Sequence, residues 1–185
     1  MFKVIYKYSA CIKICTHDVN ILCDPWFGKN AYEGTWTQFP QIQNITDFIG
    51  NFDIVYLSHI HPDHYCPETL KLLFNKFGEK EILIADWGDK HPNYLEKKLR
   101  NDGLEKFLNV KNHKIINDTE INIIPNKTGS SSDIDSALIV SSKSLQKSVL
   151  NINDCIYNKS LFNEIIKYKN KGIIANIRGT TTENP

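Results

Sequence analysis

Short runs of alternating or β-branched residues open the chain and predict strands. Residues 2–8 (FKVIYKY), 11–16 (CIKICT) and 19–24 (VNILCD) have this pattern, and short turn-prone segments separate them. Spacing this short favours antiparallel neighbours joined by tight turns. We therefore expect this part of the chain to form a three-stranded meander.

The next segment breaks the pattern. Residues 25–45 (PWFGKNAYEGTWTQFPQIQNI) combine Gly, Pro, Asn and large aromatics without a consistent period, which predicts a long loop. Loops of this length inside a compact domain are usually functional. A helical turn, TDFIG, follows, and residues 53–58 (DIVYLS) then read as a buried strand.

Helices and buried strands share the remaining chain. Residues 67–77 begin with a proline and carry one apolar face, so they predict a helix, and two more helices are expected at 91–101 and 161–168. The expected strands are 81–86, 106–110, 113–116, 120–125, 135–142, 147–153 and 172–177. Runs of strands with helices between them predict two sheets packed face to face with helices outside, within one domain spanning 1–185.

The composition fits one globular unit. The chain has 185 residues, of which 41% are hydrophobic and 23% charged, enough for one sizeable core. A net charge of +1, with both signs mixed along the chain, leaves no basic surface for a nucleic acid. No apolar run approaches the roughly 20 residues of a membrane span. The N-terminus also lacks the long apolar core of a signal peptide, so the expected compartment is the cytoplasm. The five cysteines form no CxxC pair and read as reduced thiols.

One short loop concentrates the candidate chemistry. SHIHPDH follows a predicted strand directly and holds three of the six histidines. His59 and His61 stand at i and i+2 and so point to the same side, while Pro62 bends the chain and turns Asp63 and His64 toward a second position. Imidazole and carboxylate ligands suit Zn²⁺ and also Mn²⁺ or Fe²⁺. The loop therefore predicts a site for one or two divalent ions, with zinc as the leading candidate.

Three stretches resemble the metallo-β-lactamase superfamily. DIVYLSHIHPDHYCPETL resembles its metal-binding loop, and VLNINDC resembles the strand that carries its bridging aspartate. NILCDPWFGKNAYEGTW is similar to one branch, which includes the ascorbate-6-phosphate lactonases and the metallo-β-lactamase-like part of CMP-N-acetylneuraminate hydroxylase. The resemblance implies an α/β fold, an αββα sandwich of two mixed sheets with outer helices.

The resemblance also implies roles for individual residues. His59 and His61 would hold a first metal, Asp63 and His64 a second, and Asp154 would bridge the two. Asp63 or Asp154 would also accept a proton during catalysis. The residues expected at the rim and mouth of the substrate site are Asp24, Trp26, Tyr32 and Trp36.

The chain departs from the family pattern in two places. Members commonly carry a third histidine on the strand before the bridging aspartate, but PNKTGSSSDIDSAL has none. Asn126, Ser131 and Asp133 are the candidate substitutes, and Asp133 is favoured because a carboxylate can replace imidazole on zinc. Members also carry a histidine after the bridging aspartate, whereas the last histidine here is His113.

These two departures leave two explanations open. Either the chain is truncated at its C-terminus, or it is a divergent member with one metal or none. Cys66 is expected to be inert.

Three functions remain open at this stage. The leading hypothesis is a metal-dependent hydrolase acting on a small anionic, carbohydrate-derived lactone, amide or phosphoester. The first alternative is one component of a CMP-sialate hydroxylase-like oxygenase system, whose iron–sulfur ligands this chain lacks. The second is a degenerate, non-catalytic binding module, which the incomplete ligand set motivates.

Overall fold

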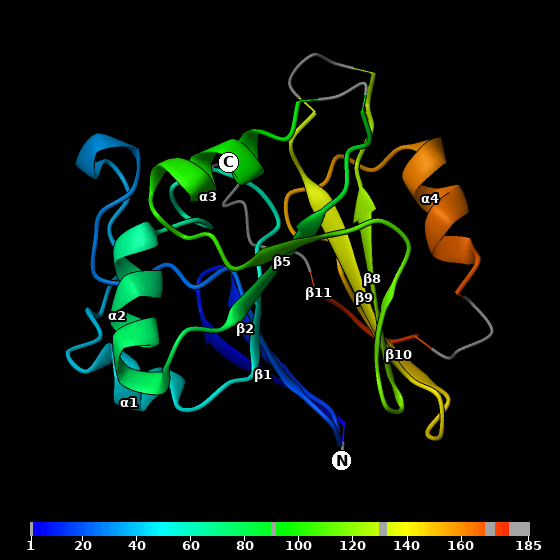
Figure 1. Cartoon of the computed structure of the whole chain (residues 1–185), viewed down its shortest axis with the longest axis horizontal. Helices are drawn as coiled ribbons and strands as arrows, with labels where there is room; N and C mark the ends of the chain where they lie inside the picture. Colours follow the sequence, from blue (N-terminus) through cyan, green and yellow to red (C-terminus); the bar gives the residue numbers. More distant parts are fainter. Residues whose placement is uncertain (1, 90–91, 130–132, 169–172, 178–185) are drawn as a thin grey trace.

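Two β-sheets lie face to face and carry helices on both outer faces (Figure 1). The structure, a computed structural model, describes residues 2–89, 92–129, 133–168 and 173–177. Its layers confirm the predicted αββα sandwich. None of the helices in these ranges is long and apolar enough to cross a membrane.

The first sheet is mixed, in the order β1-β2-β3-β4-β5-β6. Its strands are β1 (Lys3–Tyr8), β2 (Cys11–Cys15), β3 (Asn20–Cys23), β4 (Ile54–Tyr56), β5 (Glu81–Ala85) and β6 (Phe107–Val110). The first three are antiparallel, as the meander predicts, and β3 to β6 are parallel. Parallel neighbours need crossover connections, and these contain α1 (Ile45–Ile49), α2 (Pro67–Phe77) and α3 (Tyr94–Asn101).

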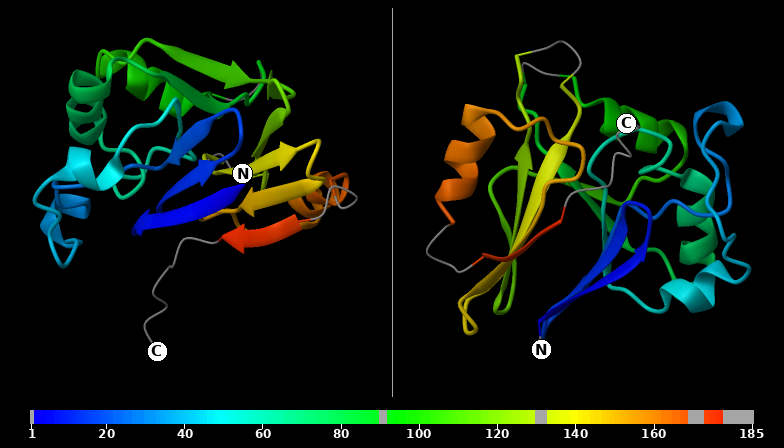
Figure 2. Two further views of the ribbon diagram at one scale, coloured as in Figure 1. Left: turned by 90° about the horizontal axis from the view of Figure 1, so that it is seen from below. Right: turned by 180° about the vertical axis from the view of Figure 1, so that it is seen from behind.

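The second sheet is also mixed, in the order β11-β10-β9-β8-β7. Its strands are β7 (Lys114–Ile116), β8 (Thr119–Pro125), β9 (Ser136–Ser142), β10 (Lys147–Asn151) and β11 (Ile173–Ile177). β7 to β10 are antiparallel, and β11 pairs parallel to β10 after a crossover that contains α4 (Lys159–Ile166). The two sheets and their separate helices are visible from below and behind in Figure 2.

Alternation along the strands divides the apolar residues between three layers. The central layer lies between the sheets and includes Ile14, Ile21, Tyr56, Ile123 and Val140. A second layer lies under α1, α2 and α3, and a third lies under α4. Each sheet therefore packs against apolar side chains on both of its faces.

Side-chain caps account for the helix boundaries that differ from the expected ones. Asn158 accepts a hydrogen bond from the Leu161 N–H, so α4 begins two residues earlier than predicted. Asn93 caps α3 in the same way, and His91, the predicted start of that helix, lies outside the described residues. The long loop after β3 is more ordered than its composition suggests, since it contains the 3₁₀ turn Tyr32–Gly34.

Candidate metal centre

The loop after β4 is held in place on both sides. The Ser136 hydroxyl of β9 donates to the Ser58 carbonyl at 2.9 Å, which ties the start of the loop to the second sheet. The N–H groups of His64 and Tyr65 both bond the His61 carbonyl, at 3.0 and 2.8 Å. The loop is therefore a tight turn fixed between a buried strand and helix α2.

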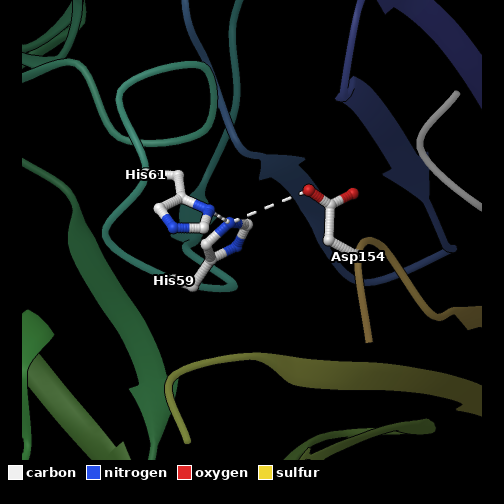
Figure 3. A group of neighbouring side chains, drawn as sticks. All are labelled: His59, His61 and Asp154. Carbon is white, nitrogen blue, oxygen red and sulfur yellow. Dashed lines mark hydrogen bonds and ion pairs between the residues drawn. The ribbon is translucent and has the colours of Figure 1, made fainter. Parts of the chain in front are cut away.

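A first group of candidate ligands comes from this loop and from the segment after β10. His59, His61 and Asp154 each offer a ligand atom, and these atoms all lie within 4.8 Å of one another (Figure 3). His59 Nε2 is 2.8 Å from His61 Nδ1 and 3.9 Å from Asp154 Oδ2. Two imidazole nitrogens and a carboxylate oxygen thus face one position.

A second group shares the same aspartate. Asp63, His64 and Asp154 also place one ligand atom each within 4.8 Å of the others. His64 Nε2 lies 3.3 Å from Asp154 Oδ2 and 3.7 Å from Asp63 Oδ2. Asp154 therefore stands between the two groups, which is the arrangement that the resemblance implies. The N-cap of α4 is Asn158, so Asp154 does not serve as a helix cap.

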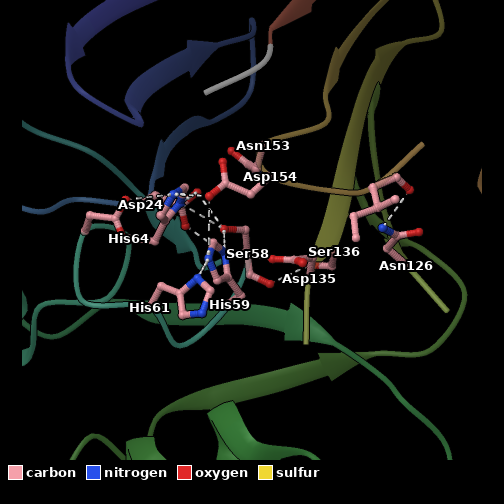
Figure 4. A network of polar contacts seen from close by, with 12 residues as sticks. Asp24, Ser58, His59, His61, His64, Asn126, Asp135, Ser136, Asn153 and Asp154 are labelled. Atoms are coloured by element: carbon pink, nitrogen blue, oxygen red, sulfur yellow. Dashed lines mark hydrogen bonds and ion pairs between the residues drawn. The ribbon is translucent and has the colours of Figure 1, made fainter. Parts of the chain in front are cut away.

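Asp24, directly after β3, orients the histidines of both groups (Figure 4). Its carboxylate accepts the Ser58 N–H and Oγ–H, both at 2.8 Å, and lies 3.1 Å from His64 Nδ1. The Ser58 hydroxyl donates its single hydrogen to Asp24. Its oxygen therefore accepts a hydrogen bond from His59 Nδ1 at 2.9 Å. Each ring thus turns Nδ1 toward this network and Nε2 toward its ligand group.

This geometry corrects the expected role of Asp24. Its side chain is 0% exposed and both of its oxygens accept hydrogen bonds from the protein. It therefore does not contact a substrate at the rim. Its backbone φ of 43° is one that few non-glycine residues adopt, in keeping with a position at a functional site.

Charge is unevenly divided between the histidines. Burial alone would lower the pKa of His64, but hydrogen bonds to Asp154 and Asp24 raise that pKa to about 10. Burial and the charges of His64 and His61 lower the pKa of His59 to about 2. Burial would raise the pKa of Asp154, yet the contact with His64 holds it below its ordinary value. Without an ion, His64 is protonated at neutral pH and His59 is neutral.

Asp135, a residue that the sequence did not single out, lies beside His59 on the Nδ1 side of the ring and belongs to neither ligand group. Asp135 Oδ1 is 3.4 Å from His59 Nδ1, is buried, and has no hydrogen-bond partner in the described part of the chain. Burial and the charge of Asp154 raise the pKa of Asp135. Its only sequence signal is its position immediately before the buried strand β9.

The three substitutes named from the sequence behave differently. Asp133 accepts hydrogen bonds from the N–H groups of Thr128 and Gly129, so it closes its own loop and belongs to neither ligand group. Asn126 donates to the Ile156 carbonyl at 3.0 Å and thereby clamps the segment that follows Asp154. Ser131 lies outside the described residues.

Tyr32 lies beside the second group, and Trp36 packs against Tyr32. The Tyr32 hydroxyl donates to Asp63 Oδ1 at 2.8 Å, and its ring meets the Trp36 ring edge to face at 5.2 Å. Both side chains are partly exposed, at 37% and 45%. They offer aromatic surface next to the candidate ligands.

Trp26 does not share this position. It is 4% exposed, packs with Ala31 and Cys66, and donates its indole N–H to the Lys29 carbonyl at 2.6 Å. Trp26 and Cys66 line a separate cavity of about 270 Å³ between the histidine loop and α3. The expectation that Trp26 shapes the metal-site mouth is therefore wrong, because its side chain packs inside the loop instead.

The residues present suit divalent cations. Both groups combine imidazole nitrogen with carboxylate oxygen, the donor types that zinc, manganese and iron accept. Four carboxylates gather here, those of Asp24, Asp63, Asp135 and Asp154. With neutral imidazoles, two divalent ions would balance their four negative charges.

Comparison with known proteins agrees with the fold and the loop. The family model for the β-lactamase superfamily domain matches residues 3–148. The isothiocyanate hydrolase from Delia radicum gut bacteria aligns structurally with a TM-score of 0.65 at 14% identity, covering 93% of this chain and 69% of that one. At this identity the structural match shows a common fold.

Two relatives are similar in sequence and much longer. A Mycolicibacterium smegmatis protein, named for a Rieske 2Fe-2S iron–sulfur centre, is 32% identical over 143 residues, which cover 73% of this chain and 26% of the relative. The cytidine monophosphate-N-acetylneuraminic acid hydroxylase of Asterias rubens is 30% identical over 109 residues, covering 57% and 17%. The chain spans about a quarter or less of these proteins. On its fold, its histidine loop and the family match, the chain belongs to the metallo-β-lactamase superfamily.

Proposed function

We propose that this chain is a metal-dependent hydrolase domain that holds two divalent ions. The observation that supports this most directly is that Asp154 belongs to both ligand groups. His59 and His61 would hold the first ion and Asp63 and His64 the second, with Asp154 shared. Asp135, next to His59 Nδ1, would help to orient that ring toward the first ion.

The chemistry is divided between the ions and the chain. Bound divalent ions lower the pKa of water and polarise a carbonyl or phosphoryl oxygen of a substrate. Asp24 and Ser58 fix the rings of His59 and His64 through their Nδ1 atoms, so that their Nε2 atoms would be free to hold the ions. Asp154 is partly exposed, with 24% of its side chain accessible, and so stands where it could accept a proton during hydrolysis. Asp63 is the alternative acceptor.

The proposed substrate is a small anionic, carbohydrate-derived lactone, amide or phosphoester. A ligand set this rich in carboxylates repels anions on its own, so an anionic substrate requires the bound ions. The exposed rings of Tyr32 and Trp36 could stack on a sugar face. The relative named for a CMP-sialic acid hydroxylase is consistent with a sugar acid. We place the activity in the cytoplasm, in keeping with five free, buried cysteines.

The test is hydrolysis of a panel of sugar lactones and sugar phosphoesters with Zn²⁺, Mn²⁺ or Fe²⁺ added back to metal-free protein. Activity should require the metal and disappear in His61→Ala. The matched control is His113→Ala, which removes an exposed histidine from outside both ligand groups. Turnover that persists without metal would refute the proposal. A folded protein that takes up no metal would favour a non-catalytic binding module.

A second candidate is one component of an iron-dependent hydroxylase system. It is favoured by the names of the two longer relatives, one of them a hydroxylase and the other named for a Rieske centre. Such a role needs electrons from a separate iron–sulfur protein. Oxygen consumption by the iron-loaded chain with a reduced iron–sulfur protein and CMP-N-acetylneuraminate would support it. Absence of oxygen uptake alongside metal-dependent hydrolysis would exclude it.

A further inference from the structure

The two oxygens of Asp63 face different partners. Oδ2 lies 3.7 Å from His64 Nε2, on the side of the second ligand group. Oδ1 accepts the Tyr32 hydroxyl at 2.8 Å. The side chain of Asp63 is largely buried, so few other donors can replace that hydroxyl. A carboxylate held in this way offers one oxygen to a cation and keeps the other engaged.

The backbone around Tyr32 is built to present this hydroxyl. Tyr32 and Glu33 are successive non-glycine residues with φ of 49° and 56°. Ala31 and Trp36 close the turn through two backbone hydrogen bonds, at 3.0 and 3.2 Å, and Thr35 Oγ1 donates to the Tyr32 carbonyl at 2.8 Å. Such strained conformations persist only where surrounding contacts determine them, and they gather at functional sites.

The aromatic contacts of Tyr32 fix its ring on the same side. Its centroid lies 5.2 Å from Trp36 and 6.2 Å from the His61 ring. The closed turn, the two ring contacts and the hydroxyl bond therefore all direct one side chain at one carboxylate oxygen. A residue that served only to fill the loop would not need its hydroxyl at Asp63.

We propose that Tyr32 is a positioning residue that holds Asp63 as a one-oxygen ligand of the second ion. This inference rests on the proposed two-ion function. Partners that hydrogen-bond metal ligands commonly strengthen metal binding by about 10- to 100-fold. The loop after β3 would then take part in loading the second ion, besides bordering the mouth of the site.

The test is a Co²⁺ titration of metal-free protein, followed by absorption and by competition with a chelator. Tyr32→Phe removes one oxygen atom and leaves the ring in place. Tyr94→Phe is the matched control, because Tyr94 is a partly exposed tyrosine at the start of α3. His64→Ala identifies which equivalent belongs to the second group. Circular dichroism and melting temperature check that each variant is folded.

We expect Tyr32→Phe to weaken binding of the second equivalent of Co²⁺ by about 10- to 100-fold and to change the absorption spectrum of that equivalent. Binding of the first equivalent should stay within about twofold of wild type. Unchanged binding of both equivalents would overturn the inference and leave the two-ion proposal intact. Equal weakening of both, or weakening of the first alone, would also overturn it, since the effect would then not be specific to Asp63. Wild-type protein that binds fewer than two ions would overturn the two-ion proposal and this inference together.

Discussion

Asp24 lies 3.1 Å from His64 Nδ1 through the same oxygen that accepts the Ser58 hydroxyl. One buried carboxylate thus orients a histidine in each ligand group, His64 directly and His59 through Ser58. The two groups are therefore coupled through Asp24 and Ser58, which belong to neither group.

Asp24→Asn is expected to disturb both stability and metal binding. The Ser58 and His64 groups that contact the Asp24 carboxylate would then meet the N–H hydrogens of an amide. Buried donors would be left unpaired, which should lower the free energy of unfolding by about 1–3 kcal/mol. Urea unfolding of metal-free protein should show this loss, and the affinity for both ions should fall about 10- to 100-fold. Asp53→Asn, at a carboxylate exposed near the other end of β3, is the control. A variant that loses affinity for one ion only would contradict the coupling.

The stability of the metal-free protein should peak near pH 6.5. The pKa of His64 is raised from 6.5 to about 10, so its stabilising contribution is complete below pH 6.5 and is lost as the pH rises through 10. The pKa of His59 is lowered from 6.5 to about 2, so folding is increasingly penalised as the pH falls below 6.5. Urea midpoints between pH 5 and 10 measure this profile. A flat alkaline side in wild-type protein would contradict the assignment to His64.

Metal binding should release protons. His64 is protonated at neutral pH without an ion, yet it must be neutral at Nε2 to bind one. Calorimetric titrations at pH 7.5 in buffers of different ionisation enthalpy should therefore show release of about one proton for the second ion. The apparent affinity should rise by up to about tenfold per pH unit below pH 9. Zinc binding without proton release would show that His64 is not a ligand.

The same substitution should weaken metal binding at Asp135 and leave it nearly unchanged at Asp133. Asp135→Asn removes the negative charge of a carboxylate whose buried oxygen lies beside His59 Nδ1. We expect it to weaken binding of the first ion about 10-fold or more. The Asp133 carboxylate accepts hydrogen bonds from the Thr128 and Gly129 N–H groups and belongs to neither ligand group. Asp133→Asn should therefore keep the metal affinity within about twofold of wild type. Metal competition assays on the two variants make the comparison. The reverse order would restore Asp133 as the substitute ligand.

The sequence predicted the fold well because its signals are local. Alternation and turn residues located β1 to β3, and a proline followed by an apolar face located α2. Capping was harder to predict, since Asn93 and Asn158 fix the starts of α3 and α4 with single side-chain bonds. These bonds depend on loop geometry more than on periodicity.

The site was only partly predictable for a related reason. The spacing of SHIHPDH and the resemblance at Asp154 named residues that the structure brings together. Asp133 and Asp135 are two positions apart in one loop, so alternation gives them the same side, and only the start of β9 at Ser136 separates their roles. Trp26, Tyr32 and Trp36 share one aromatic-rich segment, and only its turn at Tyr32–Gly34 decides which of them meets the ligands.

Metal content per chain in wild-type protein and in Asp154→Ala, measured by mass spectrometry after zinc loading, tests the shared aspartate most directly. Because Asp154 belongs to both ligand groups, we predict two equivalents in the wild type and loss of both in the variant. His61→Ala and His64→Ala should each lose one. Two equivalents retained in folded Asp154→Ala, or none in folded wild-type protein, would contradict a two-ion centre built around Asp154.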